Sequence, residues 1–153
     1  MTINGERALR SELEKLMRIE RPRIVADIAE ALAQGDLREN AEFQYAKEEQ
    51  GFIEGRIAEI AGKLSNVQII NITELPRTGK VIFGVTVKLL NIDTENETTY
   101  QIVGEDESDI KSGKLSVYSP IARALIGKSE GDEVVVKAPS GDIEYEICTV
   151  EHI

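Results

Sequence analysis

Residues 46–67 have the sequence AKEEQGFIEGRIAEIAGKLSNV, in which apolar side chains recur at helical spacing. From Ile53 onward the steps between them are 4, 3, 4 and 3 residues. This alternation is typical of a helix that packs along one seam, as in a coiled coil. The seam is predicted to contain Ala46, Ile53, Ile57, Ile60, Leu64 and Val67.

A second apolar stripe precedes this segment and predicts its partner helix. It consists of Leu9, Leu13, Leu16, Met17, Ile24, Ile28 and Leu32. Gly35 lies between the stripes, and glycine favours a helix end because it tolerates left-handed backbone angles. We therefore expect two antiparallel helices, each of about 27 residues and about 40 Å long, that project as an arm. Pro22 has no N–H and crowds the preceding turn, so it predicts a kink in the first helix.

The second half of the chain has the signals of a small sheet. Runs rich in β-branched residues predict strands over 80–90, 98–103, 133–137 and 143–147, the last two joined as a hairpin. Ser119 as a cap and Pro120 at the first helical position predict one short helix, ended by Gly127. The predicted fold class is α+β, with an antiparallel helical hairpin over residues 1–73 and a twisted sheet domain over residues 74–153.

The composition narrows the function classes. The chain has 28 acidic and 18 basic residues and a net charge of −10, so little independent nucleic-acid binding is expected. One cysteine, Cys148, and one histidine, His152, argue against an internal disulfide, a Cys- or His-rich metal site and a Ser-His-Asp triad. We expect His152 to be solvated near the C-terminus.

The chain has no long apolar run and no leader-like N-terminus, so it is predicted to be a cytoplasmic protein. Nothing in the sequence requires more than a monomer.

The connection between the two helices carries the most informative polar residues. Asp36 and Glu39 are three residues apart at a predicted helix start, which is the spacing of a capping box with aspartate in the cap position. The same two carboxylates are also hard oxygen ligands that Mg²⁺ accepts, although Mg²⁺ needs further oxygens from a partner. Both interpretations stay open, and they are compatible. Phe43 and Tyr45 are predicted either to staple the helix ends together or to stack on a base.

Two separated motifs carry a resemblance to a known family. The segment GDLRENAEF at 35–43, followed by QGFIEGRI at 50–57, resembles the hairpin of bacterial transcript cleavage factors of the GreA/GreB family. The segment SPIARALIGK at 119–128, followed by GDEV at 131–134, resembles the C-terminal signature of the same family. The resemblance covers nearly the whole chain. The small basic patch, which consists of Arg38, Lys47 and Arg56, resembles the GreA type more than the GreB type.

The resemblance implies an FKBP-like C-terminal domain that docks on RNA polymerase and a coiled coil that enters the polymerase secondary channel. Asp36 and Glu39 would share a Mg²⁺ ion with the polymerase, so that the polymerase cleaves its own backtracked RNA. The free factor would bind no cofactor stably. The polymerase-binding residues would be Ser119, Pro120, Ile121 and Arg123. The residues expected to contact RNA or the channel are Arg38, Asn40, Phe43 and Lys47.

Two other functions remain as alternatives. A channel-binding inhibitor of RNA polymerase would share the fold, but the presence of both tip acids, Asp36 and Glu39, favours cleavage. An FKBP-like peptidyl-prolyl isomerase would need an aromatic-lined proline pocket. The sheet half offers few aromatic residues for one, namely Phe83, Tyr100, Tyr118 and Tyr145. We therefore predict a transcription elongation factor that acts as a cofactor rather than as an enzyme.

Overall fold

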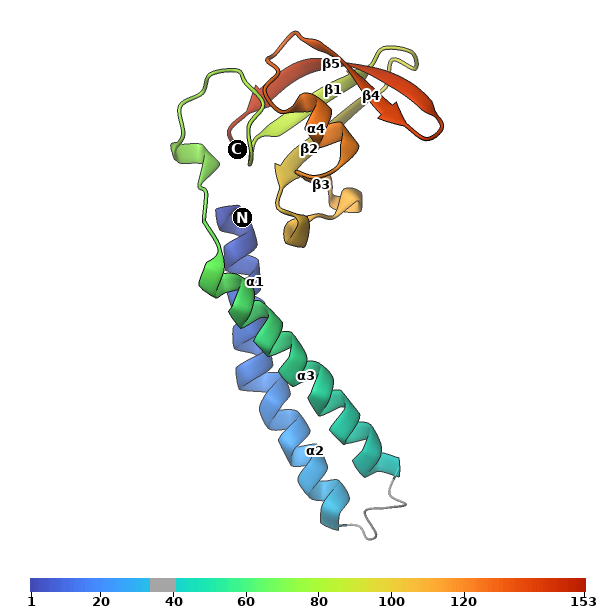
Figure 1. The fold of residues 1–153 in the computed structure, drawn as a ribbon. Coiled ribbons are helices and arrows are strands. Elements are labelled where there is room, and N and C mark those ends of the chain that lie inside the picture. Colours follow the sequence, from blue (N-terminus) through green and yellow to red (C-terminus); the bar gives the residue numbers. More distant parts are fainter. Residues whose placement is uncertain (34–40) are drawn as a thin grey trace. The chain divides into compact units, whose positions relative to one another are not determined.

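The computed structural model describes residues 1–33 and 41–153. Within these ranges the chain forms two compact units (Figure 1). One unit is the helical segment Asn4–Gln68. The other combines Ile69–Ile153 with the first three residues, Met1–Ile3. Asp36, Arg38, Glu39 and Asn40 lie outside the described residues.

The helical unit is the predicted hairpin. The first arm consists of α1 (Ile3–Lys15), a π-helical turn (Leu16–Glu20) and α2 (Arg21–Ala33), and the second arm is α3 (Ala41–Asn66). α2 runs alongside α3 (Figure 1). The two helices pack through a seam of apolar side chains. Its buried residues are Ile24, Ala31, Ala46, Ile53, Ile57 and Ile60. Five of these six positions belong to the predicted stripes, so the helical period identified most of the seam. The predicted stripe residues Met17 and Leu32, in contrast, are each 45% exposed.

The interruption expected at Pro22 takes the form of the π-helical turn that precedes it. The N–H of Arg21 donates to the carbonyl of Leu16, five residues back, instead of four. Pro22 has no N–H to donate, and its ring crowds the carbonyl of the residue four positions earlier, Arg18. The wider turn accommodates this missing bond while the helix continues into α2.

Ion pairs between the arms flank the apolar seam. The guanidinium of Arg21 donates to both carboxylate oxygens of Glu54 at 2.7 and 2.9 Å, and that of Arg56 donates to Glu12 at 2.9 and 2.7 Å. The hydrogen bond from Arg56 lowers the pKa of Glu12, and the one from Arg21 lowers the pKa of Glu54. Both carboxylates therefore stay charged at neutral pH, and they help to fix the register of the two arms.

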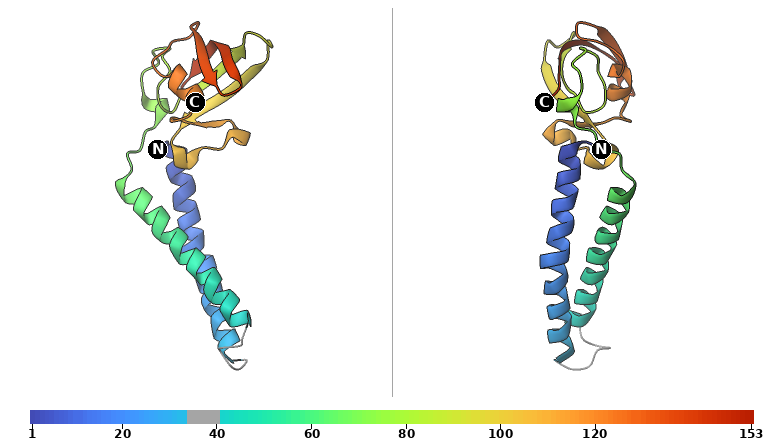
Figure 2. Two further views of the ribbon diagram at one scale, coloured as in Figure 1. Left: turned by 45° about the vertical axis from the view of Figure 1, so that its right-hand side comes forward. Right: turned by 90° about the vertical axis from the view of Figure 1, so that its left-hand side faces the viewer.

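The C-terminal unit is a twisted sheet with one helix on it (Figure 2). The strands are β1 (Thr86–Asn91), β2 (Glu97–Val103), β3 (Lys114–Ser116), β4 (Glu133–Ala138) and β5 (Gly141–Glu151). Their order across the sheet is β3-β2-β1-β5-β4, antiparallel throughout except for the β2–β3 pair. The core contains Val81, Val85, Val87, Leu89, Ile102, Leu115, Leu125, Val134 and Ile147. The predicted α+β class is confirmed, whereas the FKBP-like label stays a prediction.

The short helix α4 (Pro120–Leu125) begins where the sequence predicts. The hydroxyl of Ser119 accepts a hydrogen bond from the Ala122 N–H at 3.2 Å, and Pro120 occupies the first turn. Ala122 and Leu125 are fully buried in the core of the sheet, so the helix is held by its apolar side as well as by its cap. Gly127 follows the helix with φ of 87°, a left-handed conformation that favours glycine.

Three predictions need correction. The expected strand over 80–90 begins only at Thr86, because Gly84 adopts φ of 93° and turns the chain. The strand β3 and the 3-10 helices before it, at Glu105–Glu107 and Ile110–Ser112, were not predicted. His152 is 2% exposed instead of solvated, and its Nδ1 lies 3.2 Å from the carbonyl oxygen of Ile72.

Hydrogen bonds hold the N-terminal residues Met1–Ile3 in the sheet unit. Thr2 forms a parallel bridge with Ile70, and the carboxylate of Glu107 accepts hydrogen bonds from the Thr2 N–H at 2.7 Å and from its hydroxyl at 3.0 Å. Thr2 is 6% exposed. Within the 3-10 helix Glu105–Glu107, Glu105 and Asp106 are exposed, whereas Glu107 is half-buried.

Candidate functional site

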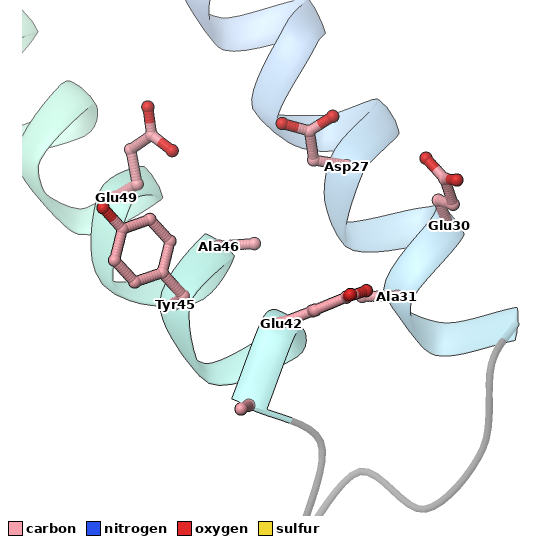
Figure 3. Close-up of a pocket in the computed structure, with 8 residues that line it drawn as sticks. Asp27, Glu30, Ala31, Glu42, Tyr45, Ala46 and Glu49 are labelled. Carbon is pink, nitrogen blue, oxygen red and sulfur yellow. The ribbon is translucent and has the colours of Figure 1, made fainter.

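The described ends of the hairpin helices border the acidic connection. α2 ends at Ala33 and α3 begins at Ala41, so Asp36 and Glu39 belong to the segment that joins them. Between the two helix ends lies a groove with a volume of about 600 Å³ (Figure 3). It is lined by Asp27, Glu30, Ala31, Ala41, Glu42, Tyr45, Ala46 and Glu49.

Small residues on the seam open this groove. Ala31 and Ala46 are buried on facing helices, and neither side chain extends far enough to fill the space beside it. Figure 3 shows Glu42 reaching from α3 towards Ala31 of α2, with Asp27 and Glu30 further along α2. The groove therefore combines an apolar floor with carboxylates at its rim.

Arg23 neutralises part of the rim. Its guanidinium donates to Asp27 at 3.1 Å, to Glu20 at 3.1 Å and to Glu49. Hydrogen bonds to Glu49 and then to Glu20 raise the pKa of Arg23, so it is always charged. Glu30 and Glu42 form no ion pair with any residue of the described ranges, and they leave the groove acidic.

The described residues do not form a metal site by themselves. In residues 1–33 and 41–153, no group of three or more Asp, Glu, His or Cys side chains could hold a metal ion. Asp36 and Glu39 offer two further carboxylates, a donor set that fits Mg²⁺ in chemistry but is too small to hold it alone. A magnesium ion at these residues would therefore need oxygen ligands from a partner.

Phe43 and Lys47 lie one helical turn apart on the first turns of α3. Phe43 is half-buried, whereas Lys47 is exposed and its Nζ donates to the side-chain oxygen of Gln50 at 3.2 Å. Tyr45 directly precedes the seam residue Ala46 in the sequence, and Lys47 directly follows Ala46. At 3.6 residues per turn, Lys47 and Tyr45 consequently lie on opposite sides of the seam. The structure thus brings Phe43 and Lys47 together on one flank, and it separates them from Tyr45.

The second candidate surface surrounds α4. Pro120 and Arg123 are exposed, and the Arg123 guanidinium forms no ion pair with any described residue. Ile121 is half-buried against the core, and the Ser119 hydroxyl is engaged in the helix cap. Sequence reasoning missed two neighbours, Tyr118 and Ile126, which are 62% and 40% exposed. Tyr118 precedes the cap residue and Ile126 follows the short helix, and these positions were a usable signal for an apolar extension of this surface.

No helix in the described ranges combines the length and the apolar content needed to cross a bilayer.

Comparison with known proteins gives matches over the whole chain. Residues 1–69 match the family described as "Transcription elongation factor, N-terminal", and residues 76–152 match "Transcription elongation factor, GreA/GreB, C-term".

Individual relatives are similar along their full length. The chain is 61% identical to the transcription elongation factor GreA of Thioalkalivibrio sulfidiphilus and 58% identical to that of Ruthia magnifica, over 100% of this chain and 97% of each relative. Among solved structures, it is similar to GreA factor homolog 1 of Thermus thermophilus, with 25% identity, coverage of 99% of this chain and 97% of that one, and a TM-score of 0.43. The two family matches and the full-length relatives show that this chain belongs to the GreA/GreB family of transcription elongation factors.

Proposed function

We propose that this factor binds RNA polymerase, inserts its helical hairpin into the secondary channel and stimulates the polymerase's own cleavage of backtracked RNA. The proposal rests on the sequence positions of Asp36 and Glu39, which fall between the last residue of α2, Ala33, and the first residue of α3, Ala41. Two acids in that connection sit on the part of a helical hairpin that a narrow channel admits first. The protein itself is a cofactor of transcription rather than an enzyme, and it acts in the cytoplasm as a monomer.

Mg²⁺, when bound, stabilises the charge that develops on the oxygens of the cleaved phosphodiester. The role of Asp36 and Glu39 is to add carboxylate oxygens to an ion that the polymerase holds weakly. Residues Arg38, Asn40, Phe43 and Lys47 would contact RNA or the channel wall near the ion, and they would orient the hairpin there.

Docking on the polymerase is assigned to the sheet unit. Pro120 and Arg123 face solvent at α4, while the cap of Ser119 and the packing of Ile121 hold the helix in place. Arg123 is the charged residue of this set, and no described carboxylate neutralises it. In this arrangement the surface around α4 supplies docking contacts, and the hairpin connection supplies activity.

The test is a cleavage assay on a stalled, backtracked elongation complex, with Mg²⁺ varied. The variants Asp36→Asn and Glu39→Gln keep the size and much of the hydrogen-bonding capacity of the caps but remove the charge. They should reduce stimulated cleavage by orders of magnitude, keep polymerase binding, and recover partly at high Mg²⁺, because occupancy follows mass action. Arg123→Glu should instead weaken binding.

Wild-type cleavage by the double variant Asp36→Asn, Glu39→Gln at low Mg²⁺ would contradict the metal role and leave only helix capping. A wild-type chain that binds and blocks transcription without stimulating cleavage would identify an inhibitor instead. Unchanged binding of the Arg123→Glu variant would remove α4 from the docking surface. Circular dichroism of each variant verifies that the fold is retained.

A further inference from the structure

One flank of α3 exposes two aromatic rings that the hairpin does not use. Tyr45 and Phe52 are each 72% exposed, although the chain contains few aromatic residues. They are seven residues apart, so they lie on the same side of the helix about 10.5 Å apart along its axis. Exposed large rings that repeat along one helix face are typical of a contact surface, because they bury much area at low entropic cost.

Carboxylates occupy the space between the rings. Glu48 and Glu49 lie at the intermediate helical positions, and together with Tyr45 and Phe52 they line a shallow hollow of about 290 Å³. Tyr45 and Glu49 also line the larger groove, so the two hollows share a border. Figure 3 shows both of these side chains on α3. We call this surface, which consists of Tyr45, Glu48, Glu49 and Phe52, the acidic aromatic flank.

The charge of the flank restricts its partner. Among the described residues that line the two hollows, none carries a positive charge. Glu49 is paired with Arg23, whereas Glu48 is exposed and forms no ion pair within the described ranges. Such a surface repels the phosphates of RNA and attracts cations.

The combination of rings and carboxylates favours the guanidinium group. Arginine stacks its flat face on aromatic rings and at the same time donates several hydrogen bonds in one plane to carboxylates. The hairpin already uses the carboxylate part of this chemistry at the edge of the flank, where Arg23 donates to Asp27, Glu20 and Glu49. Lysine fits less well, because its compact ammonium is strongly hydrated and has no flat face.

We propose that the acidic aromatic flank binds an arginine-bearing protein segment of the polymerase that receives the hairpin. This inference rests on the proposed function, and it assigns the two sides of α3 to different contacts. The flank with Phe43 and Lys47 is free of this acidic surface and can approach RNA, whereas the flank with Tyr45 and Phe52 meets protein. The arginine is held by stacking on a ring and by hydrogen bonds to Glu48.

The experiment measures binding of the factor to core polymerase without nucleic acid and, separately, the concentration dependence of stimulated cleavage. The variants are Tyr45→Ala with Phe52→Ala, and Glu48→Gln alone. The double variant should raise the concentration for half-maximal binding and cleavage about tenfold or more, because it removes both stacking surfaces. The maximal cleavage rate should stay near that of the wild type, since Asp36 and Glu39 are unchanged. Glu48→Gln should weaken binding less and reduce its dependence on salt.

Matched controls are Val25→Ala, which shortens an exposed apolar side chain on α2, and Gln44→Ala, which alters an exposed residue beside Tyr45. Both should bind as the wild type does. The rings are exposed, so their removal leaves the fold intact, and the helical circular dichroism should not change.

Three outcomes would overturn the inference. Wild-type affinity of the Tyr45→Ala, Phe52→Ala variant would show that the rings contact nothing. A loss seen only when RNA is present would assign them to nucleic acid. A lower maximal rate at unchanged affinity would place the flank in catalysis instead of docking. If the wild-type chain itself neither binds nor stimulates cleavage, the proposed function fails first, and that result is separate from these three.

Discussion

Truncation of the buried side chain of Ile24 tests the packing of the hairpin seam. Ile24 is 0% exposed, and it packs in a cluster with Ala46, Ile53 and Ile57, with Leu13, Leu16 and Ile28 at its edge. The change Ile24→Ala removes three carbon atoms from this cluster. At about 0.8 kcal/mol for each buried methylene, the lost transfer free energy is about 2.4 kcal/mol. The remaining cavity adds to it, and the higher helix propensity of alanine offsets a few tenths, so we expect a loss of about 3 kcal/mol.

Urea unfolding followed by circular dichroism at 222 nm measures this loss. The signal reports mainly on the hairpin, because α4 of the sheet unit is only 6 residues long while α3 alone has 26. Val25 is the matched control, since it is the next residue along the helix and is 51% exposed. Val25→Ala should change the unfolding free energy by about 0.5 kcal/mol or less. A midpoint for Ile24→Ala equal to that of Val25→Ala would refute the assignment of the seam.

Two further predictions concern charged contacts. The pKa values of Glu12 and Glu54 are lowered in the folded state by their pairs with Arg56 and Arg21. The stability that these pairs contribute is therefore complete above the ordinary carboxyl pKa of 4.5, and it is lost as the pH falls through the lowered pKa values. The urea midpoint of the hairpin should therefore fall less on acidification for a Glu12→Gln, Glu54→Gln variant than for the wild type, and an equal fall in both would count against this. Glu107→Ala removes the acceptor of two hydrogen bonds from the buried residue Thr2, which should cost about 1–3 kcal/mol and speed hydrogen exchange at the Ile70 amide. Exposed Glu105, in the same 3-10 helix, is the control, and matching exchange rates in the two alanine variants would disprove the role of Glu107.

The parts of the fold that the sequence predicted are those set by local rules. The hairpin follows from apolar spacing, and α4 follows from the Ser119 cap and Pro120. The incorrect predictions concern elements whose structure depends on contacts between residues that are far apart in the sequence. Val81 and Val85 have the composition of a strand, but the positive φ of Gly84 and the approach of Ile72 to it turn the chain there. Strand β3 has only three residues, too few to show a period, and its pairing with β2 is parallel and non-local.

The distinction between local rules and distant contacts also applies to the candidate sites. The acids Asp36 and Glu39 stand out in the sequence because two carboxylates at a helix start have a recognisable spacing, but spacing alone does not separate a cap from a metal ligand. His152 was misjudged because its burial depends on the chain segment around Ile72, which is remote in sequence. The exposure of the Tyr45 and Phe52 rings was missed, although each directly precedes a residue of the predicted seam. A position beside the seam fixes the side of the helix, but not how much of the side chain the partner helix covers.

The position of the acidic aromatic flank makes affinity and activity separable. Tyr45 and Phe52 lie several residues beyond the connection that carries Asp36 and Glu39, on a helix that is held against the first arm by the buried seam and by the pair of Arg21 with Glu54. A residue that contributes only to docking changes the concentration at which the factor acts, whereas a ligand to the shared ion changes the rate at saturation. High Mg²⁺ should therefore rescue Asp36→Asn but not the Tyr45→Ala, Phe52→Ala variant. Equal rescue of both would mean that the rings act through the ion, and the division of α3 into a docking flank and an active end would be wrong.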